Sequence, residues 1–170
     1  MLRSIAFLLA AILALPAMAQ DHSNSDYLDA ITADFNGTSE KLNSLAQAIS
    51  EDHFDWSPAE GVRSVVEVLN HVSDANFGIA ASLGHMSDYE ASNIDTKEGA
   101  LARLSASQAH VVELLASLAK ADLSTTTELF GMTINHYGAI GILTGHTHEH
   151  LGQLIAYARS NEIAPPWSGG

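Results

Sequence analysis

The stretch GHTHEHLGQLIAYAR, residues 145–159, decides the fold of this 170-residue chain. Leu151, Leu154 and Ile155 recur at intervals of three and four, which is typical of an amphipathic helix. Apolar residues continue the pattern upstream, and Pro165 and Pro166 prevent a helix from continuing downstream. We therefore predict a long helix over about residues 135–161.

Three histidines occur within five positions of this helix. A helix places residues four apart on one face, so His146 and His150 can bind one divalent ion together. His148 is two positions from each and points about 200° away at roughly 100° per residue. We expect His148 to be exposed, and any third ligand has to come from another helix.

Working outward, three more helical patterns precede this one, over about residues 25–49, 64–85 and 96–121. Ser64 and Glu67 have the spacing of a capping box, and Thr96 lies close to the start of the third helix. Residues 122–132 are rich in β-forming residues but short, and we expect a loop there. The fold class predicted is all-α, a four-helix bundle. Because some connections are long, the helix order need not be up-down-up-down.

The first 19 residues have the pattern of a secretory signal peptide. Arg3 precedes an uncharged apolar run that ends at Pro16, and Ala17-Met18-Ala19 precedes the predicted cut before Gln20. A retained membrane anchor is the alternative, although the run is short for a span of about 20 residues. We expect residues 20–170 to form a single domain in the periplasm or outside the cell, with no membrane segment after cleavage.

The charge and the lack of cysteine exclude several function classes. The formal net charge is −13, which repels nucleic-acid phosphates, so we expect no nucleic-acid partner. The chain has no cysteine, so it forms no disulfide and supplies no catalytic thiolate.

His71 is the best candidate for the third ligand, because it lies beside the apolar stripe of the second helical pattern. From the residues alone, a partly buried histidine satisfied by a hydrogen bond is the favoured role, ahead of metal ligation. His136 is a reserve ligand near the start of the last helix.

Several motifs in this order resemble the DinB superfamily, the DinB/YfiT-like metalloenzymes. They are Trp56-Ser57-Pro58, Leu69-Asn70-His71, His146-x-x-x-His150-Leu151-Gly152-Gln153 and the C-terminal Pro165-Pro166-Trp167-Ser168. The resemblance covers about residues 25–168. It implies a four-helix bundle in which three histidines hold a divalent metal, and these map onto His71, His146 and His150.

The resemblance also suggests roles for residues after His150. Gly152 could allow close helix approach, Gln153 could support the metal ligands, and Tyr157 lies one turn further along the helix. Helix packing is the alternative for Gly152 and Tyr157. A homodimer is also consistent with the family.

Three neutral imidazoles favour zinc, nickel or ferrous iron over calcium or magnesium. With an open position, such an ion can activate bound water or hold a substrate thiolate. We therefore expect a metal-dependent enzyme, either a transferase that uses a low-molecular-weight thiol or a hydrolase. Relatives in the family use mycothiol or bacillithiol as the thiol. The small molecule that would react with the thiol or with water is not identified by the sequence. The alternatives are a non-catalytic metal-binding or stress-related protein, and histidines that bind no metal.

Overall fold

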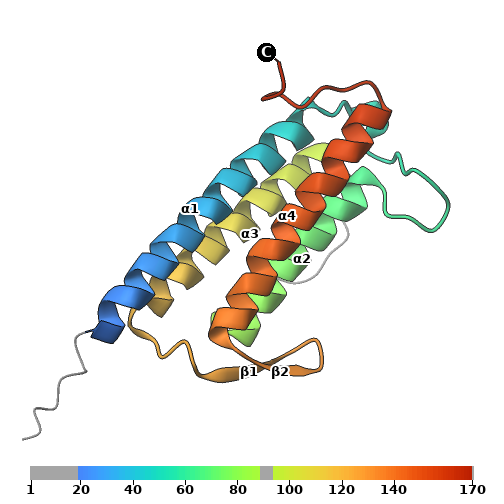
Figure 1. Cartoon of the computed structure of the whole chain (residues 1–170). Helices are drawn as coiled ribbons and strands as arrows, with labels where there is room; N and C mark the ends of the chain where they lie inside the picture. Colours follow the sequence, from blue (N-terminus) through green and yellow to red (C-terminus); the bar gives the residue numbers. More distant parts are fainter. Residues whose placement is uncertain (1–18, 89–93, 170) are drawn as a thin grey trace, which may run out of the picture.

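The computed structural model describes residues 19–88 and 94–169, with side chains from residue 24 onward. It contains four long helices: α1 (Ala19–Ala48), α2 (Val65–Ser82), α3 (Lys97–Ser117) and α4 (His136–Ser160) (Figure 1). The mostly helical fold confirms the predicted class, and the last three helices lie within a few residues of their predicted bounds. Residues 1–18, which carry most of the predicted signal peptide, lie outside the described part. Within that part, no helix combines the length and apolarity needed to cross a membrane.

The four helices run up, down, down and up (Figure 1). Tyr27 near the start of α1 contacts Tyr137 at the start of α4, so these two helices are parallel. Asn70 and Asn76 of α2 contact Arg103 and Ser107 of α3 in the same order, so α2 and α3 are parallel too. Both α3 and α4 pack against α1 and against α2. This arrangement makes α2 the antiparallel neighbour of α4.

Side-chain caps fix where three of the helices begin. The Ser64 hydroxyl accepts from the Glu67 backbone N–H, and the Glu67 carboxylate accepts from the Ser64 N–H, so the predicted capping box forms at α2. Thr96 caps α3, and Asn135 caps α4 by accepting from the Gly138 N–H. A short 3-10 helix, η1 (Glu51–His53), lies between α1 and α2, and another, η2 (Leu118–Lys120), extends α3.

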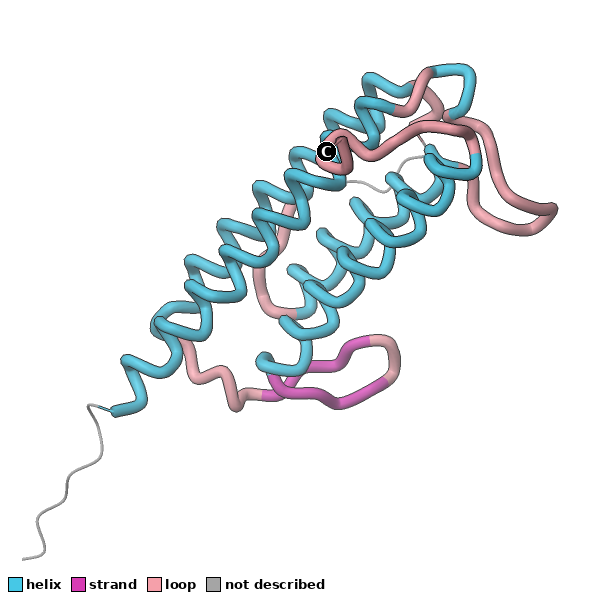
Figure 2. Tube along the Cα trace, turned by 45° about the horizontal axis from the view of Figure 1, so that its top comes forward, coloured by secondary structure: helices cyan, strands magenta, loops and turns pink. Residues whose placement is uncertain are grey.

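The expectation of a loop at residues 122–132 was wrong. Strands β1 (Thr126–Leu129) and β2 (Met132–Asn135) pair in an antiparallel hairpin across one end of the bundle (Figure 2). The two-residue turn Phe130–Gly131 has positive φ at both positions, 52° and 76°, as a tight hairpin turn requires. The threonines before the turn favour a strand, but Phe-Gly is a weak turn signal compared with Asn-Gly.

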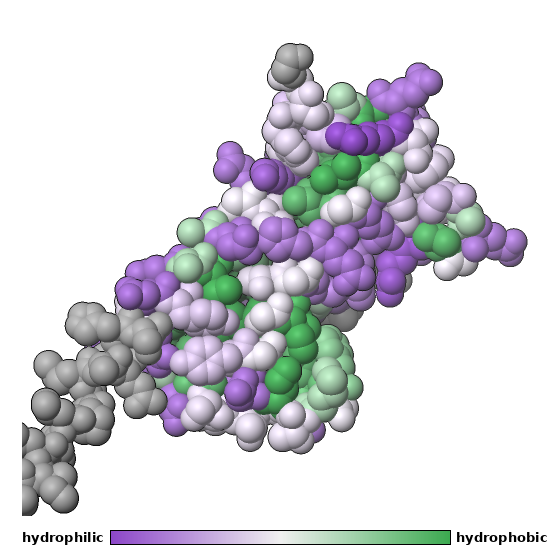
Figure 3. Space-filling model, viewed as in Figure 1, coloured by the Kyte–Doolittle hydropathy of each residue, from purple (hydrophilic) through white to green (hydrophobic). Residues whose placement is uncertain are grey.

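The buried core divides into two apolar clusters along the bundle axis, with a polar layer between them. Phe35, Ile79 and Leu143 belong to one cluster, and Leu42, Leu69 and Leu154 belong to the other. The buried side chains between the two clusters are polar, and they are Thr38, Ser39, Asn70, Ser73, Asn76, Arg103, Ser107, Gln108, Thr144, Thr147 and His150. Figure 3 shows hydrophilic residues gathered across the middle of one face, with hydrophobic residues on either side. The polar layer is where α2 and α4 present their histidines.

Candidate metal centre

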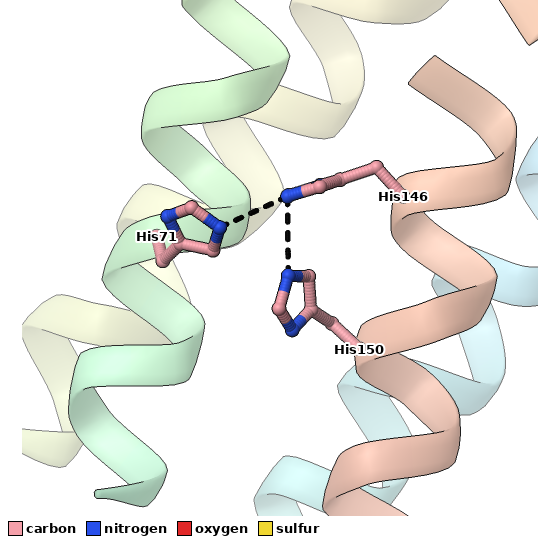
Figure 4. Close-up of side chains that lie close together, drawn as sticks. All are labelled: His71, His146 and His150. Carbon is pink, nitrogen blue, oxygen red and sulfur yellow. Dashed lines mark hydrogen bonds between the residues drawn. The ribbon is translucent and has the colours of Figure 1, made fainter. Parts of the chain in front are cut away.

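His71 of α2 and His146 and His150 of α4 converge on one point (Figure 4). The Nε2 atom of His146 lies 3.0 Å from Nε2 of His71 and 3.1 Å from Nε2 of His150. Two nitrogens bound to one ion at about 2.05 Å lie about 2.9 to 3.4 Å apart for octahedral or tetrahedral angles. Both distances from His146 therefore fit a shared divalent ion.

A chain of hydrogen bonds fixes the tautomer of His150. The backbone carbonyl of Arg63 can only accept, so the Tyr157 hydroxyl donates to it at 3.0 Å. Tyr157 then accepts from the Gln153 amide nitrogen at 2.7 Å, which turns the Gln153 carbonyl oxygen toward His150. That oxygen lies 2.7 Å from Nδ1 of His150, so Nδ1 carries the proton and donates it. The lone pair of neutral His150 is consequently on Nε2 and faces the other two histidines.

Three neutral imidazoles cannot satisfy this arrangement by themselves. If His146 is protonated on Nδ1, its Nε2 lone pair faces the lone pair of His150 at 3.1 Å. If His146 is protonated on Nε2, its single N–H faces two nitrogens, Nε2 of His71 and Nε2 of His150. A cation among the three Nε2 atoms satisfies every lone pair, so the donor set fits a bound metal ion.

The electrostatic surroundings keep His146 and His71 neutral. Burial, followed by the nearby His150, His71 and Arg63, lowers the pKa of His146 from 6.5 to about 4. Burial, Arg63 and His150 also lower the pKa of His71. Both imidazoles are therefore unprotonated at neutral pH, which is the form that binds a metal.

A cavity of about 640 Å³ opens beside His71, between α2 and the connections before and after it. Charged residues line it, but two of them are already engaged: Glu67 caps α2, and Asp74 pairs with the buried Arg103. Asn70, which also lines the cavity, connects α3 to the segment before it: its side-chain oxygen accepts from Arg103 at 2.7 Å, and its side-chain nitrogen donates to the Ile94 carbonyl at 2.7 Å. Arg63 is exposed at this cavity. Neither Arg63 nor Arg103 belongs to a recognisable motif, so the sequence did not predict either residue at this cavity.

The other candidate histidines lie away from this point. His148 faces α1, where its Nε2 lies 2.9 Å from a carboxylate oxygen of Asp34, and half of its side chain is exposed. His136 is the first residue of α4, about 15 Å along the helix from His146 at 1.5 Å per residue. His136 is therefore outside the cluster for which it was the reserve ligand.

Two residues after His150 differ in what they contribute. The expectation that Gly152 allows close helix approach was wrong, because a Cβ at this exposed position meets no atom within 4 Å. Tyr157 is both a packing residue and a hydrogen-bonding residue. Its ring packs edge-on against Trp56 at 5.2 Å between centroids, while its hydroxyl orders Gln153. Trp56 thus packs against Tyr157, one of the residues in the series of hydrogen bonds that leads to His150.

Comparisons with known proteins agree with this architecture. The family model described as the DinB superfamily matches residues 34–154, more than half of the chain. The chain is 25% identical over 123 residues to "Uncharacterized protein YjoA" of Bacillus subtilis, a match that covers 69% of this chain and 79% of that protein.

Two crystal structures of DinB-like proteins share the fold. The one from Bacillus cereus has a TM-score of 0.72 at 18% identity, covering 81% of this chain and 95% of the other. The structure of the Bacillus subtilis YjoA protein has a TM-score of 0.66 at 23% identity, covering 79% of this chain and 92% of the other.

Proposed function

This chain belongs to the DinB superfamily, and from that premise we propose that it is a metal-dependent enzyme. The ion is a divalent transition metal, zinc, nickel or ferrous iron, held by His71, His146 and His150. The observation that carries the proposal is the convergence of three Nε2 atoms beside an open cavity. A non-catalytic metal-binding site has no need of such a cavity.

When bound, the ion offers an open coordination position and lowers the pKa of a thiol or water molecule that binds there. The residues of the chain do the rest. Gln153 holds His150 in the tautomer that presents Nε2, and Arg63 at the cavity offers a guanidinium to an anionic group of the substrate. His71 and His146 stay neutral at physiological pH, as ligation requires.

A small thiol is the nucleophile that makes the least demand on these residues. Of the carboxylates that line the cavity, Glu67 caps a helix and Asp74 pairs with Arg103. This leaves Asp55 and Asp95 as the candidates for a general base in a hydrolase. With a metal ion bound at the triad, a thiol would have a lowered pKa and would need no protein base to lose its proton to solvent. We therefore propose a transferase that adds a low-molecular-weight thiol to an electrophilic small molecule.

Metal content tests the site itself. The purified protein is stripped with a chelator, reloaded with zinc, nickel or ferrous iron, and assayed by mass spectrometry for bound metal. We expect His71→Ala, His146→Ala and His150→Ala each to lose the tightly bound ion. His148→Ala is the matched control from the same helix and should keep it. If none of the three variants loses metal, or if His148→Ala loses as much, the site is refuted.

Cobalt substitution tests the reaction class. We expect bacillithiol or glutathione, added to the Co²⁺-loaded protein, to produce a thiolate-to-cobalt charge-transfer band that is absent in His146→Ala. The same protein should then transfer the thiol to a chromogenic electrophile. Hydrolysis of an activated ester without a thiolate band would overturn the transferase in favour of a hydrolase. Metal binding without either activity would make this a metal-binding protein without catalysis.

A further inference from the structure

A second group of metal-binding side chains lies far from the triad, where α2 ends against α3. It consists of His85, His110 and Glu113, whose candidate ligand atoms all lie within 4.8 Å of one another. At 1.5 Å per residue, the 11 positions from His71 to Ser82, the last residue of α2, span roughly 16 Å, and His85 follows in the turn after the helix. The second group therefore shares no ligand with the first.

The turn that ends α2 places His85 against α3. Gly84 adopts a positive φ of 86°, which a residue with a side chain rarely adopts. The Gly84 N–H donates to the Ala81 carbonyl at 3.0 Å, and the His85 N–H donates to the Ala80 carbonyl at 2.9 Å. These two bonds are those of a Schellman motif, which fixes the backbone at His85.

His110 and Glu113 stand one turn apart on α3, so they face the same direction. The His110 ring packs 5.3 Å from the Phe77 ring and 4.4 Å from the His85 ring, measured between centroids. Its Nε2 donates to the His85 carbonyl oxygen at 3.1 Å, so an ion bound through this nitrogen would replace that hydrogen bond. The Glu113 carboxylate approaches Nε2 of His85 at 3.9 Å and is 72% exposed, so it can move toward an ion at little cost.

Two imidazoles and one carboxylate are a ligand set that suits zinc, with the remaining position open. A hydrogen-bonded histidine pair with a salt bridge to Glu113 is the alternative arrangement without a metal. The chain's formal charge of −13 raises the local concentration of cations at every exposed site. Because Glu113 is exposed and His85 is only half-buried, the affinity should be lower than that of the triad.

We propose that His85, His110 and Glu113 form a second, weaker site for a divalent transition metal of the zinc class, which ties the end of α2 to α3. This proposal does not depend on the function proposed for the triad.

Zinc titration of the metal-free protein by calorimetry tests it. We expect wild type to bind two zinc ions, the second more weakly, and His110→Ala to bind one. Glu113→Gln should weaken the second ion about tenfold or more, and because Glu113 is exposed, this change leaves the fold intact. His53→Ala, an imidazole on η1 bonded to Ser50, is the matched control and should keep both ions.

A triad-deficient variant, His146→Ala with His150→Ala, separates the two sites. It should keep one weak zinc ion, and adding Glu113→Gln should weaken that ion to the same extent as in wild type. The proposal is overturned if wild type binds a single zinc ion. It is also overturned if the second ion binds equally well in His110→Ala and Glu113→Gln, because that ion is then adventitious.

Discussion

At the scale of single residues, the orientation of His150 is set by a backbone carbonyl three hydrogen bonds away. The Arg63 carbonyl orients the Tyr157 hydroxyl, which orients the Gln153 amide, which holds the Nδ1 proton of His150. Partners of this kind fix ring orientation and raise the basicity of a metal-binding histidine. Gln153 therefore acts on the proposed metal without touching it.

Truncating Gln153 tests this chain of bonds. We expect Gln153→Ala to lower metal affinity about 10- to 100-fold, because His150 loses its acceptor. Gln153→Glu should retain most of the affinity, since a carboxylate also accepts from Nδ1. Tyr157→Phe keeps the packing against Trp56 and should cost less than Gln153→Ala. Competition with a chromogenic chelator measures all three, and wild-type affinity in Gln153→Ala would show that the chain of bonds does not support the ion.

Helical spacing predicted correctly that His146 and His150 share a face and that His148 is exposed, because both follow from local geometry. Helical spacing could not decide whether His71 is a third ligand or a histidine satisfied by a hydrogen bond, because that depends on which helices become neighbours. The family resemblance supplied it. The role expected for Gly152 failed for the same reason, because nothing local reveals that this position faces open space.

At the scale of elements, local chemistry determined most boundaries. Capping residues at 64, 96 and 135 carry their own hydrogen-bonding groups, so the helix starts could be predicted from the sequence alone. The hairpin could not, because its four-residue strands are too short for a clear alternation, and its turn depends on Phe130 adopting a positive φ. The packing of the hairpin against the bundle is a tertiary contact, in which Thr127 donates to the Ser82 carbonyl at 2.5 Å.

Ser64 gives the sharpest test of a helix boundary. We expect Ser64→Ala to lower the free energy of unfolding by about 1 kcal/mol, because the Glu67 N–H at the start of α2 loses its acceptor. Ser44→Ala, inside α1, is the matched control and should be neutral or slightly stabilising, since alanine is the better helix former. Urea unfolding followed by circular dichroism measures both. Equal effects in the two variants would mean that the cap adds nothing.

At the scale of the whole molecule, the order of the helices is what assembles the polar layer. Parallel α2 and α3 set Asn70 beside Arg103 and Asn76 beside Ser107, while antiparallel α4 sets His146 beside His71. The connection between Ser82 and Lys97 is long enough for α3 to run parallel to α2. The sequence indicated that this connection is long, but not the direction of the next helix, because a polar loop carries no packing information.

The position of His146 inside the bundle makes the stability of the metal-free protein depend on pH. Its pKa is about 4 in the folded protein against an ordinary 6.5, so the unfolded chain takes up this proton first as the pH falls. The stability that neutral His146 contributes is therefore fully present above about pH 6.5 and is lost progressively toward pH 4. The lowered pKa of His71 acts in the same direction.

Urea unfolding of chelator-stripped protein between pH 7.5 and 4 measures the effect. We expect the wild-type midpoint to fall over this range by more than that of His146→Gln, which cannot take up the proton and serves as the reference for all other titrating groups. Added zinc should raise the wild-type midpoint at pH 7.5, because a ligand of the folded state stabilises it. This gain should shrink toward pH 4, as protons compete for the same nitrogens. If the wild-type midpoint follows that of His146→Gln across the whole range, the pKa of His146 is the same in the folded and unfolded protein. The statement that the bundle holds His146 in the neutral, metal-binding form would then be wrong.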